Sequence, residues 1–434
     1  MLAPSHPAFS EDDFIYSPEA SELPGERIEE YGPGGFHPVT LGMVICSPKA
    51  RYRVMQKLGF GGYSTVWLVD IIGQPRCAAL RISKAGFFSE GEDDVLRRIA
   101  ATPSLLHVAT LLDWFTIDGP NGTHKATVME VVAPMMAAMY FLENAADSAL
   151  EAHSVPTTTV SETIHPTASH SSIALNKAVV RSLVEAVAEL HGSGIVHGDL
   201  HFANVGFALP TLFDGSDKER IWSRPDVTVV VPRDPEMNIF SSHFPPYIVQ
   251  PWSFMSFLRV IGCAKIAPSV KIYDFGTSCC VERPHPTTGF LDQIIPPEWV
   301  IQGTTPDAVR LPDRACDIWA VGLMIFCLMT GGVYPYTAFN GSAPFITMAR
   351  LSGYIPASWK QLYDWANDPK LLEELSEEKC AEEWEEYRAM LRQRCSDDAD
   401  ADKLIALLRR VFALDPAERP SAADILRDPW FAST

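Results

Sequence analysis

Long apolar runs are scarce in this sequence. The longest, residues 320–329 (AVGLMIFCLM), is far shorter than the roughly 20 residues that span a bilayer, so we expect a buried helix there. The opening residues, MLAPSHPAFSEDDF, lack the basic and apolar regions of a secretory signal peptide. We therefore expect a protein without a membrane-bound part.

Basic residues and paired cysteines are also in short supply. Lys and Arg number 35 against 54 Asp and Glu, which gives a net charge of −19 and argues against nucleic-acid binding through the whole surface. Solubility is the simpler meaning of this charge, and a preference for basic partners is the alternative. The nine cysteines lack paired spacing, which predicts reduced thiols in the cytoplasm or nucleus. We expect a monomer.

The first part of the chain is rich in strand signals. Residues 1–30 are rich in Pro, Ser, Glu and Asp, which predicts disorder, and residues 31–51 form an ordered lead-in segment. Residues 52–133 contain β-branched and aromatic runs that predict a five-stranded sheet with one amphipathic helix over 92–101. This region predicts a small β-rich lobe.

Helical patterns dominate from residue 134 to residue 431 and predict a larger, mainly helical lobe. The clearest helix is ALNKAVVRSLVEAVAELHGSG, which ends at Gly192 and Gly194. A polar, low-complexity stretch precedes it, and eight prolines between residues 209 and 268 indicate an inserted segment at about 207–268. The predicted fold class is therefore α+β.

A glycine-rich hairpin is predicted between the first two strands. Its sequence, LGFGGYSTVWL at 58–68, places small residues where a backbone can approach phosphates and offer its N–H groups. A cation, Arg81, follows 22 residues after Gly59 on the third strand, behind Ala79, and Glu92 on the next helix could pair with it. A glycine-rich hairpin alone is more often an ordinary turn.

Further along, acidic and amide side chains occur in a fixed order. HGDLHFANV at 197–205 contains Asp199, which can accept a hydroxyl proton, and Asn204, which can hold Mg²⁺. KIYDFG at 271–276 is a strand that ends in Asp274, a second metal ligand. IPPEW, DIWAVG and LDPAERPSAADILRDPWF follow in turn. A chance match of all these motifs in this order is very improbable.

With these motifs the chain resembles the eukaryotic protein kinases over residues 52–431. Four features look like the SR-protein kinases, most of all their divergent fungal members: GPGGFHPV, the Ser64 form of the glycine-rich hairpin, DGPNGTH, and the spacing of 75 residues from Asp199 to Asp274. The resemblance implies a two-lobed protein-kinase-like fold, with ATP and Mg as cofactors. It also implies protein substrates that are basic and Arg/Ser-rich.

The resemblance also assigns roles to individual residues. Asp199 is the catalytic base, His201 replaces the lysine that steadies the transferred phosphoryl group, and Asn204 and Asp274 are the metal ligands. Asp317 braces the catalytic loop, and Glu298 pairs with Arg419. The nucleotide-binding residues implied by the resemblance are Leu58, Gly59, Gly61, Gly62, Ser64, Val66, Ala79, Arg81, Glu92, Met129, Glu130 and Val132.

Three departures from the kinase pattern keep three functions open. Arg81 stands where kinases have lysine, Gly198 where they have arginine, and His201 where they have a second lysine. Retention of Asp199, Asn204 and Asp274 favours an active serine/threonine kinase. Arg81 and His201 favour a pseudokinase that binds nucleotide as a scaffold, whereas Gly198, a change that SR-protein kinases share, fits constitutive rather than switched activity. The sequence HGDLHFAN is also typical of small-molecule phosphotransferases, although the motifs after residue 295 argue against that class.

Overall fold

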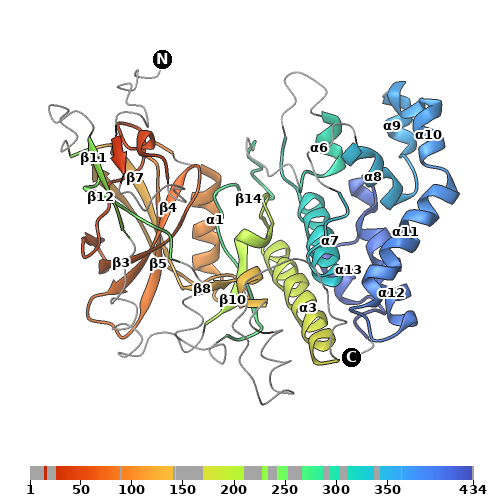
Figure 1. Ribbon diagram of the computed structural model, residues 1–434, viewed down its shortest axis with the longest axis horizontal. Coiled ribbons are helices and arrows are strands. Elements are labelled where there is room, and N and C mark those ends of the chain that lie inside the picture. Colours follow the sequence, from red (N-terminus) through yellow and green to blue (C-terminus); the bar gives the residue numbers. More distant parts are fainter. Residues whose placement is uncertain are drawn as a thin grey trace. The chain divides into compact units, whose positions relative to one another are not determined.

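The computed structural model describes twelve stretches of the chain and divides them into two compact units (Figure 1). The described residues are 14–16, 26–87, 90–139, 142, 170–209, 227–232, 242–252, 266–286, 294–302, 310–336, 343–362 and 364–432. Unit 1 comprises residues 1–89, 109–133 and 208–267, and unit 2 comprises 90–108, 134–207 and 268–434. A β-rich unit and a mainly helical unit confirm the predicted α+β class.

Unit 1 is built on a six-stranded antiparallel sheet with the strand order β2-β3-β4-β5-β7-β6. The five predicted strands are present, and the lead-in segment adds a sixth, which was not predicted because it is so short. In sheet order, the strands are β2 (Val44–Cys46), β3 (Arg51–Phe60), β4 (Ser64–Ile71), β5 (Cys77–Ser83), β7 (Gly122–Met129) and β6 (Leu111–Gly119).

Alternating apolar side chains of this sheet form the core of unit 1. Val54, Trp67 and Leu80, from three adjacent strands, are almost completely buried, and Val128 joins them from β7. β-Branched and aromatic residues pack well on a pleated surface, which explains why these sequences form strands. The buried face holds the β3–β4 hairpin and β5 in a fixed register.

The predicted insert contributes to unit 1. β11 (Val227–Pro232) pairs with β1 (Phe14–Tyr16) and with β12 (Tyr247–Val249) in a second, three-stranded sheet. The Tyr247 hydroxyl accepts a hydrogen bond from the amide of Leu41, and Val249 lies in the core of the six-stranded sheet. The sequence prediction placed the insert in the C-lobe by chain order, whereas these tertiary contacts group it with the β-rich unit. Residues 210–226, 233–241 and 253–265 of the insert lie outside the described residues.

The lead-in segment is tied to the six-stranded sheet through buried charges. Glu26 forms an ion pair with Lys57 and accepts a hydrogen bond from the Tyr31 hydroxyl, and all three residues are buried. Ile28 is buried in the 3₁₀-helix η2 (Ile28–Glu30). The predicted disorder over 1–30 therefore does not hold for residues 26–30, because buried partners order them. Residues 1–13 and 17–25 lie outside the described residues.

Unit 2 is mainly helical. Its helices are α1 (Glu90–Ala101), α3 (His170–Gly192), α6 (Pro297–Gln302), α7 (Arg314–Thr330), α8 (Ala343–Ser352), α9 (Ala357–Leu362), α10 (Pro369–Glu374), α11 (Glu377–Arg392), α12 (Asp398–Val411) and α13 (Ala422–Leu426), with 3₁₀-helices η3 (Phe202–Asn204), η5 (Asp364–Asn367) and η6 (Pro416–Glu418). Its short strands are β9 (Ile195–Val196), β10 (Val205–Ala208), β13 (Val270–Ile272) and β14 (Cys279–Cys280). β8 (Val132–Pro134) includes the boundary at which the chain passes from unit 1 (up to residue 133) to unit 2 (from residue 134). None of the helices described here is long and apolar enough to cross a membrane.

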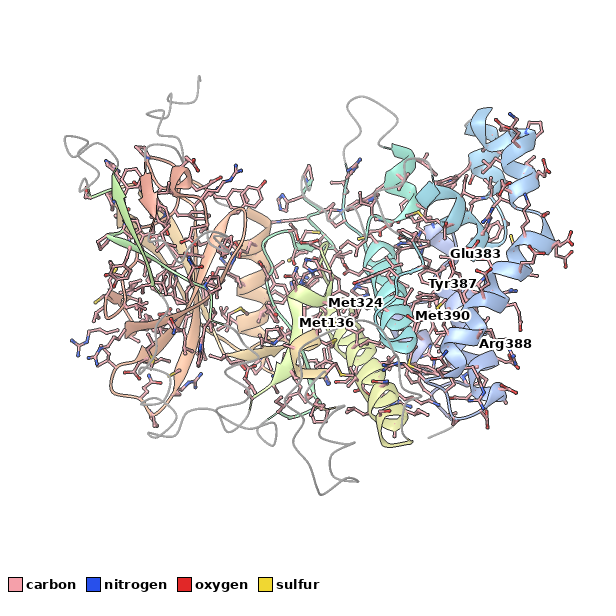
Figure 2. All side chains as sticks on the ribbon, viewed as in Figure 1. Met136, Met324, Glu383, Tyr387, Arg388 and Met390 are labelled. Carbon is pink, nitrogen blue, oxygen red and sulfur yellow. The ribbon has the colours of Figure 1, made fainter. Side chains whose placement is uncertain are left out.

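Helix α7 forms the centre of unit 2. Its residues from Cys316 to Met329 are buried, as predicted for the longest apolar run. Asp313 caps its N-terminus, and Gly331 ends it in a left-handed conformation. The Phe326 ring of α7 lies 4.9 Å from the Tyr387 ring of α11, and Figure 2 shows Met324 and Tyr387 on these two helices. This packing joins α7 to α11 within unit 2.

Candidate active site

The carboxylate of Asp317 holds the catalytic loop in unit 2. It accepts hydrogen bonds from the amides of His197 (2.8 Å) and Gly198 (2.9 Å), and the His191 ring lies 2.9 Å away. Asp317 is 2% exposed and lies in the first turn of α7, where the helix dipole favours negative charge. The bracing role implied by the resemblance is thus present, and it fixes the backbone just before Asp199.

Gly198 has a backbone conformation that suits glycine alone. Its φ is +77°, and a Cβ there would lie 3.0 Å from the carbonyl oxygen of Thr277 and 3.1 Å from Pro312. Side chains rarely adopt this φ, and these neighbours leave them little room. In the general protein-kinase pattern that the chain resembles, this position carries an arginine that binds an activation-segment phosphate, and the φ and close neighbours of Gly198 disfavour such a side chain here.

Strand pairing brings the predicted metal ligands to one place. Asn204 immediately precedes β10 and Asp274 lies two residues after β13, and these strands pair through Val205 and Ile272. The Tyr273 amide donates a 3.0 Å hydrogen bond to the Asn204 carbonyl. Asp274 has φ of +64° and is the single non-glycine residue with a positive φ in the part of the chain that the structure describes. Strained backbone of this kind is concentrated at functional sites.

The Asn204 side chain links a predicted metal ligand to Asp199, the predicted catalytic base. Its Nδ2 donates a 2.9 Å hydrogen bond to the Asp199 carbonyl, which leaves the amide Oδ1 as the atom that can ligate a cation. One carboxylate and one amide oxygen suit Mg²⁺, which keeps waters and substrate phosphates as its other ligands. Within the described ranges, no three His, Cys, Asp or Glu side chains form a metal site without such phosphates.

The two oxygens of the Asp199 carboxylate have different surroundings. Oδ1 is buried and has no hydrogen-bond partner among the described residues, while Oδ2 lies 3.5 Å from Nε2 of His201. A carboxylate oxygen in this position can accept a hydrogen bond from a hydroxyl group. Nearby, burial raises the pKa of the Tyr273 phenol, and the Asp274 carboxylate raises it further.

The predicted nucleotide residues of unit 1 lie on neighbouring strands. Leu58 and Gly59 end β3, Gly61 and Gly62 form the turn, and Ser64 and Val66 begin β4; the Gly61 amide bonds to the Ser64 carbonyl at 2.8 Å. The sheet register places Val66 opposite Arg81, and Ala79 opposite Met129. The structure thus groups the hairpin, Ala79, Arg81 and Met129 on one sheet.

Glu130 and Val132 follow Met129 in the segment predicted to contact adenine. The Glu130 carboxylate accepts hydrogen bonds from the amide (2.8 Å) and hydroxyl (2.9 Å) of Thr110, so this side chain holds the Thr110 backbone in place. Val132 lies in β8. Glu92, 5% exposed, lies on α1 of unit 2. Its pairing with Arg81, and adenine recognition by 130–132, stay predictions.

Two lysines near the hairpin have other partners. Lys84 forms an ion pair with Glu30, and its ammonium lies 4.6 Å from the Phe36 ring centroid, so this lysine has partners within unit 1. Lys57, which the sequence analysis did not single out, is completely buried beside Glu26. Burial lowers the pKa of Lys57, and Glu26 opposes this shift. The one sequence signal for Lys57 was its position next to a glycine-rich turn. In the structure this lysine belongs to a buried ion pair with Glu26.

The ion pair between Glu298 and Arg419 has the geometry that the resemblance implied. The two guanidinium nitrogens donate to the two carboxylate oxygens at 2.8 and 2.6 Å, and the Arg419 side chain is 0% exposed. Arg419 also donates to the carbonyls of Ala315, Ala413 and Leu414. This bidentate pair joins α6 to the end of the chain.

Comparison with known proteins agrees with this arrangement. Residues 263–431, which include Asp274 and both members of the Glu298–Arg419 pair, match the protein kinase domain family. Over this segment the chain is similar to the protein kinases. Over a longer stretch it is 25% identical, in 424 residues, to "Serine/threonine-protein kinase SRPK" of Physarum polycephalum, and the match covers 94% of this chain and 91% of that protein.

Other relatives point the same way. A serine/threonine protein kinase of Aspergillus fumigatus is 24% identical over 435 residues, which cover 95% of this chain and 91% of that protein. SRSF protein kinase 3 of Homo sapiens is 37% identical over 115 residues, which are 25% of this chain and 20% of that protein. Among solved structures, a kinase domain aligns at 15% identity with a TM-score of 0.47, covering 91% of this chain and 98% of that one. The sequence matches confirm the predicted likeness to divergent SR-protein kinases.

Proposed function

We propose that this protein kinase uses Mg·ATP to phosphorylate serine hydroxyls in basic, Arg/Ser-rich proteins. The observation that carries the proposal is the assembly of Asp199, Asn204 and Asp274 in unit 2. Strand pairing, the Asn204–Asp199 hydrogen bond and the strained backbone of Asp274 hold these three residues together. A scaffold that only binds other proteins has no chemical need for all three.

In the proposed reaction Asp199 receives the hydroxyl proton. Its buried Oδ1, which lacks a donor among the described residues, accepts the hydrogen bond of the serine hydroxyl and orients it for in-line attack. The Asn204 amide oxygen and the Asp274 carboxylate hold the cation. ATP supplies the phosphoryl group, and Mg²⁺ offsets the negative charge on its oxygens. Backbone N–H groups of the Gly59–Val66 hairpin bind the phosphates.

The substrate class follows from similarity and from charge. The relatives named SRPK and SRSF protein kinase support an Arg/Ser-rich substrate. The net charge of −19 supports a basic one, because complementary charge speeds encounter between partners and disfavours acidic competitors. The same charge agrees with a protein that binds no nucleic acid directly.

The deciding experiment measures phosphate transfer from Mg·ATP to an Arg-Ser repeat peptide. Asp199→Asn and Asp274→Asn are each expected to lower kcat by roughly a hundredfold or more, because one removes the base and the other a metal ligand. Asp402→Asn is the matched control: Asp402 pairs with Arg388 on the surface of the same unit, 60% exposed, and its loss should leave kcat unchanged.

The alternatives give different results in the same experiment. Nucleotide binding without transfer, in a folded wild-type protein, would favour the pseudokinase. Transfer to a small alcohol but to no peptide would favour a small-molecule phosphotransferase. The match of residues 263–431 to the protein kinase domain family argues against that last class.

A further inference from the structure

The glycine-rich turn carries an exposed aromatic ring that stacks on a second one. Tyr63 lies in the turn between β3 and β4, and Phe87 lies in residues 84–87 after β5, which we call the β5 turn. Their ring centroids are 4.6 Å apart, and the ring planes make an angle of 15°. Tyr63 is 55% exposed and Phe87 40%. Neither ring belongs to the core of unit 1, so the stack joins two surface turns.

The backbone of the β5 turn is anchored on two sides. The Ala85 amide donates a 3.0 Å hydrogen bond to the carbonyl of Gly35, which precedes β2, and the Gly86 amide donates a 3.0 Å hydrogen bond to the carbonyl of Thr123 in β7. Gly86 has φ of +70°, which suits glycine and lets the chain turn between these two bonds. Phe87 is therefore presented to Tyr63 from a backbone that the rest of unit 1 holds in place.

Lys84 connects the β5 turn directly to the glycine-rich turn. Its amide donates a 2.8 Å hydrogen bond to the Tyr63 carbonyl, and its ammonium lies 6.0 Å from the centroid of the Tyr63 ring. The same ammonium pairs with Glu30 and lies over the ring of Phe36, and both of these residues precede β2. Tyr63 is thus held through its backbone by Lys84 and through its ring by Phe87.

The glycine-rich turn has little stiffness of its own. A Cβ built on Gly59, Gly61 or Gly62 would meet no atom within 4 Å, so these three residues lie in open space. Glycine has more backbone freedom than other residues, and a free turn loses more conformational entropy when it closes on a ligand. A turn that is already held avoids part of this loss and binds more tightly. The stack on Tyr63 holds the turn at the residue that follows the glycines.

We propose that Phe87 is a positioning residue for the nucleotide phosphates: it holds the ring of Tyr63 and so fixes the glycine-rich hairpin before ATP binds. The proposal rests on the proposed function for the identity of the ligand but not for the rigidity of the hairpin. Phe87 touches no nucleotide in this role and acts through Tyr63 alone. The hairpin then differs from an ordinary glycine-rich turn by a contact that its own sequence does not contain.

The binding of Mg·ADP and of adenosine separates this role from a general effect on unit 1. Phe87→Leu keeps an apolar side chain but removes the stack. We expect the Kd of Mg·ADP to rise roughly three- to tenfold and the Kd of adenosine to stay within about twofold, because adenosine has no phosphates for the hairpin to bind. Phe87→Tyr keeps the ring and should bind both ligands as wild type does. In the transfer assay with Phe87→Leu, KM for ATP should rise by the same factor, with kcat within about twofold.

Val44→Ala is the control, because Val44 lies on β2 of the same sheet and is similarly exposed, at 41%. Its binding of both ligands should equal that of wild type. Unchanged binding of Mg·ADP in Phe87→Leu would overturn the proposal. Equal weakening of Mg·ADP and adenosine would also overturn it, because the stack would then support unit 1 in general and not the phosphate-binding hairpin.

Amide hydrogen exchange in the ligand-free protein tests the hairpin itself. The Gly61 amide donates to the Ser64 carbonyl, and the Lys84 amide donates to that of Tyr63. Both amides should exchange roughly threefold or more faster in Phe87→Leu than in wild type or Phe87→Tyr. Equal exchange in all three proteins overturns the proposal. If exchange responds as expected but wild type binds no Mg·ADP and transfers no phosphate, the function proposed above fails, whereas the fixed hairpin stands.

Discussion

The guanidinium of Arg98 on α1 lies 3.0 Å from the carboxylate of Glu282, just after β14. The same Nη1 is within 3.3 Å of the carbonyls of Ser193 and Gly194, which precede the catalytic loop. A Cβ on Gly194 would lie 2.6 Å from that nitrogen. Arg98 therefore joins α1, the turn before the catalytic loop and the segment after Asp-Phe-Gly by fixed contacts. These contacts form without a bound phosphate. In the loop that follows, Gly198 has no side chain that could bind one.

Loss of Arg98 should therefore destabilise unit 2. Arg98→Ala removes the donor to two carbonyls and one carboxylate, and we expect a loss of about 1–3 kcal/mol in the free energy of unfolding. Arg97→Ala is the control, because Arg97 is 64% exposed and pairs within its own helix, so about 0.5 kcal/mol or less is expected. Urea unfolding measures both. Equal losses in the two variants would contradict the joining role of Arg98.

The pair between Glu298 and Arg419 makes a larger contribution. Glu298→Ala leaves the fully buried guanidinium without its counter-charge, which should cost about 3–5 kcal/mol. Asp402→Ala, which breaks an exposed pair with Arg388, should cost no more than about 1 kcal/mol. Thermal and urea unfolding can be compared for the two. A small loss for Glu298→Ala would mean that the three backbone carbonyls suffice for Arg419.

The sequence predicted the parts of the site that depend on local pattern. The β3–β4 hairpin, α7 and the order of Asp199, Asn204 and Asp274 follow from glycine placement, apolar runs and fixed motif spacing, and each stands where it was expected. These features are encoded within short windows of the chain. Tertiary partners do not have to be known to predict them.

Other features depend on partners that are distant in sequence. The burial of Lys57 depends on Glu26, and the attachment of the insert depends on contacts such as Tyr247 with Leu41. The contact of His201 with the Ala203 amide likewise depends on a direction that only the folded turn defines. Residue types and chain order did not single out Lys57, and they placed the insert in the larger lobe. Contacts between residues distant in sequence decide both points.

Asn121 provides a test of the insert's attachment to unit 1. Its Nδ2 donates to the carbonyls of Phe36 (2.6 Å) and His243 (3.0 Å), and its Oδ1 lies 2.7 Å from Nδ1 of His243. Asn121→Ala leaves these buried groups unpaired, and we expect a loss of about 2–3 kcal/mol in unfolding free energy. Amide exchange over 242–249 should also become faster.

Thr123→Ala is the matched control for Asn121→Ala. Thr123 belongs to the same hairpin, and its hydroxyl bonds to Asp118 on the exposed side at 2.7 Å, so about 0.5 kcal/mol or less should be lost. Exchange over 242–249 should stay as in wild type. Unchanged exchange in Asn121→Ala as well would show that the insert is held by its strand contacts alone.

The acid sensitivity of unit 1 should arise in part from His37. Burial, together with the neighbouring His124 whose ring centroid is 4.8 Å away, lowers the pKa of His37 to about 4. Neither ring nitrogen of His37 has a hydrogen-bond partner among the described residues. His37 binds a proton at about pH 6.5 in the unfolded chain and only near pH 4 in the folded chain. Its contribution to the free energy of unfolding is therefore fully present above about pH 6.5 and falls as pH drops between these values.

The expected loss from His37 is about 2 kcal/mol between pH 7.5 and pH 5, since its folded form stays neutral while its unfolded form is protonated. In His37→Phe, which keeps an aromatic ring beside His124 without a titrating group, the loss over the same range should be smaller by that amount. Urea unfolding at the two pH values measures the difference, and His124, still present in both proteins, contributes equally to each. Identical losses would mean that the His37 ring gains a proton acceptor in the folded protein and becomes charged without cost.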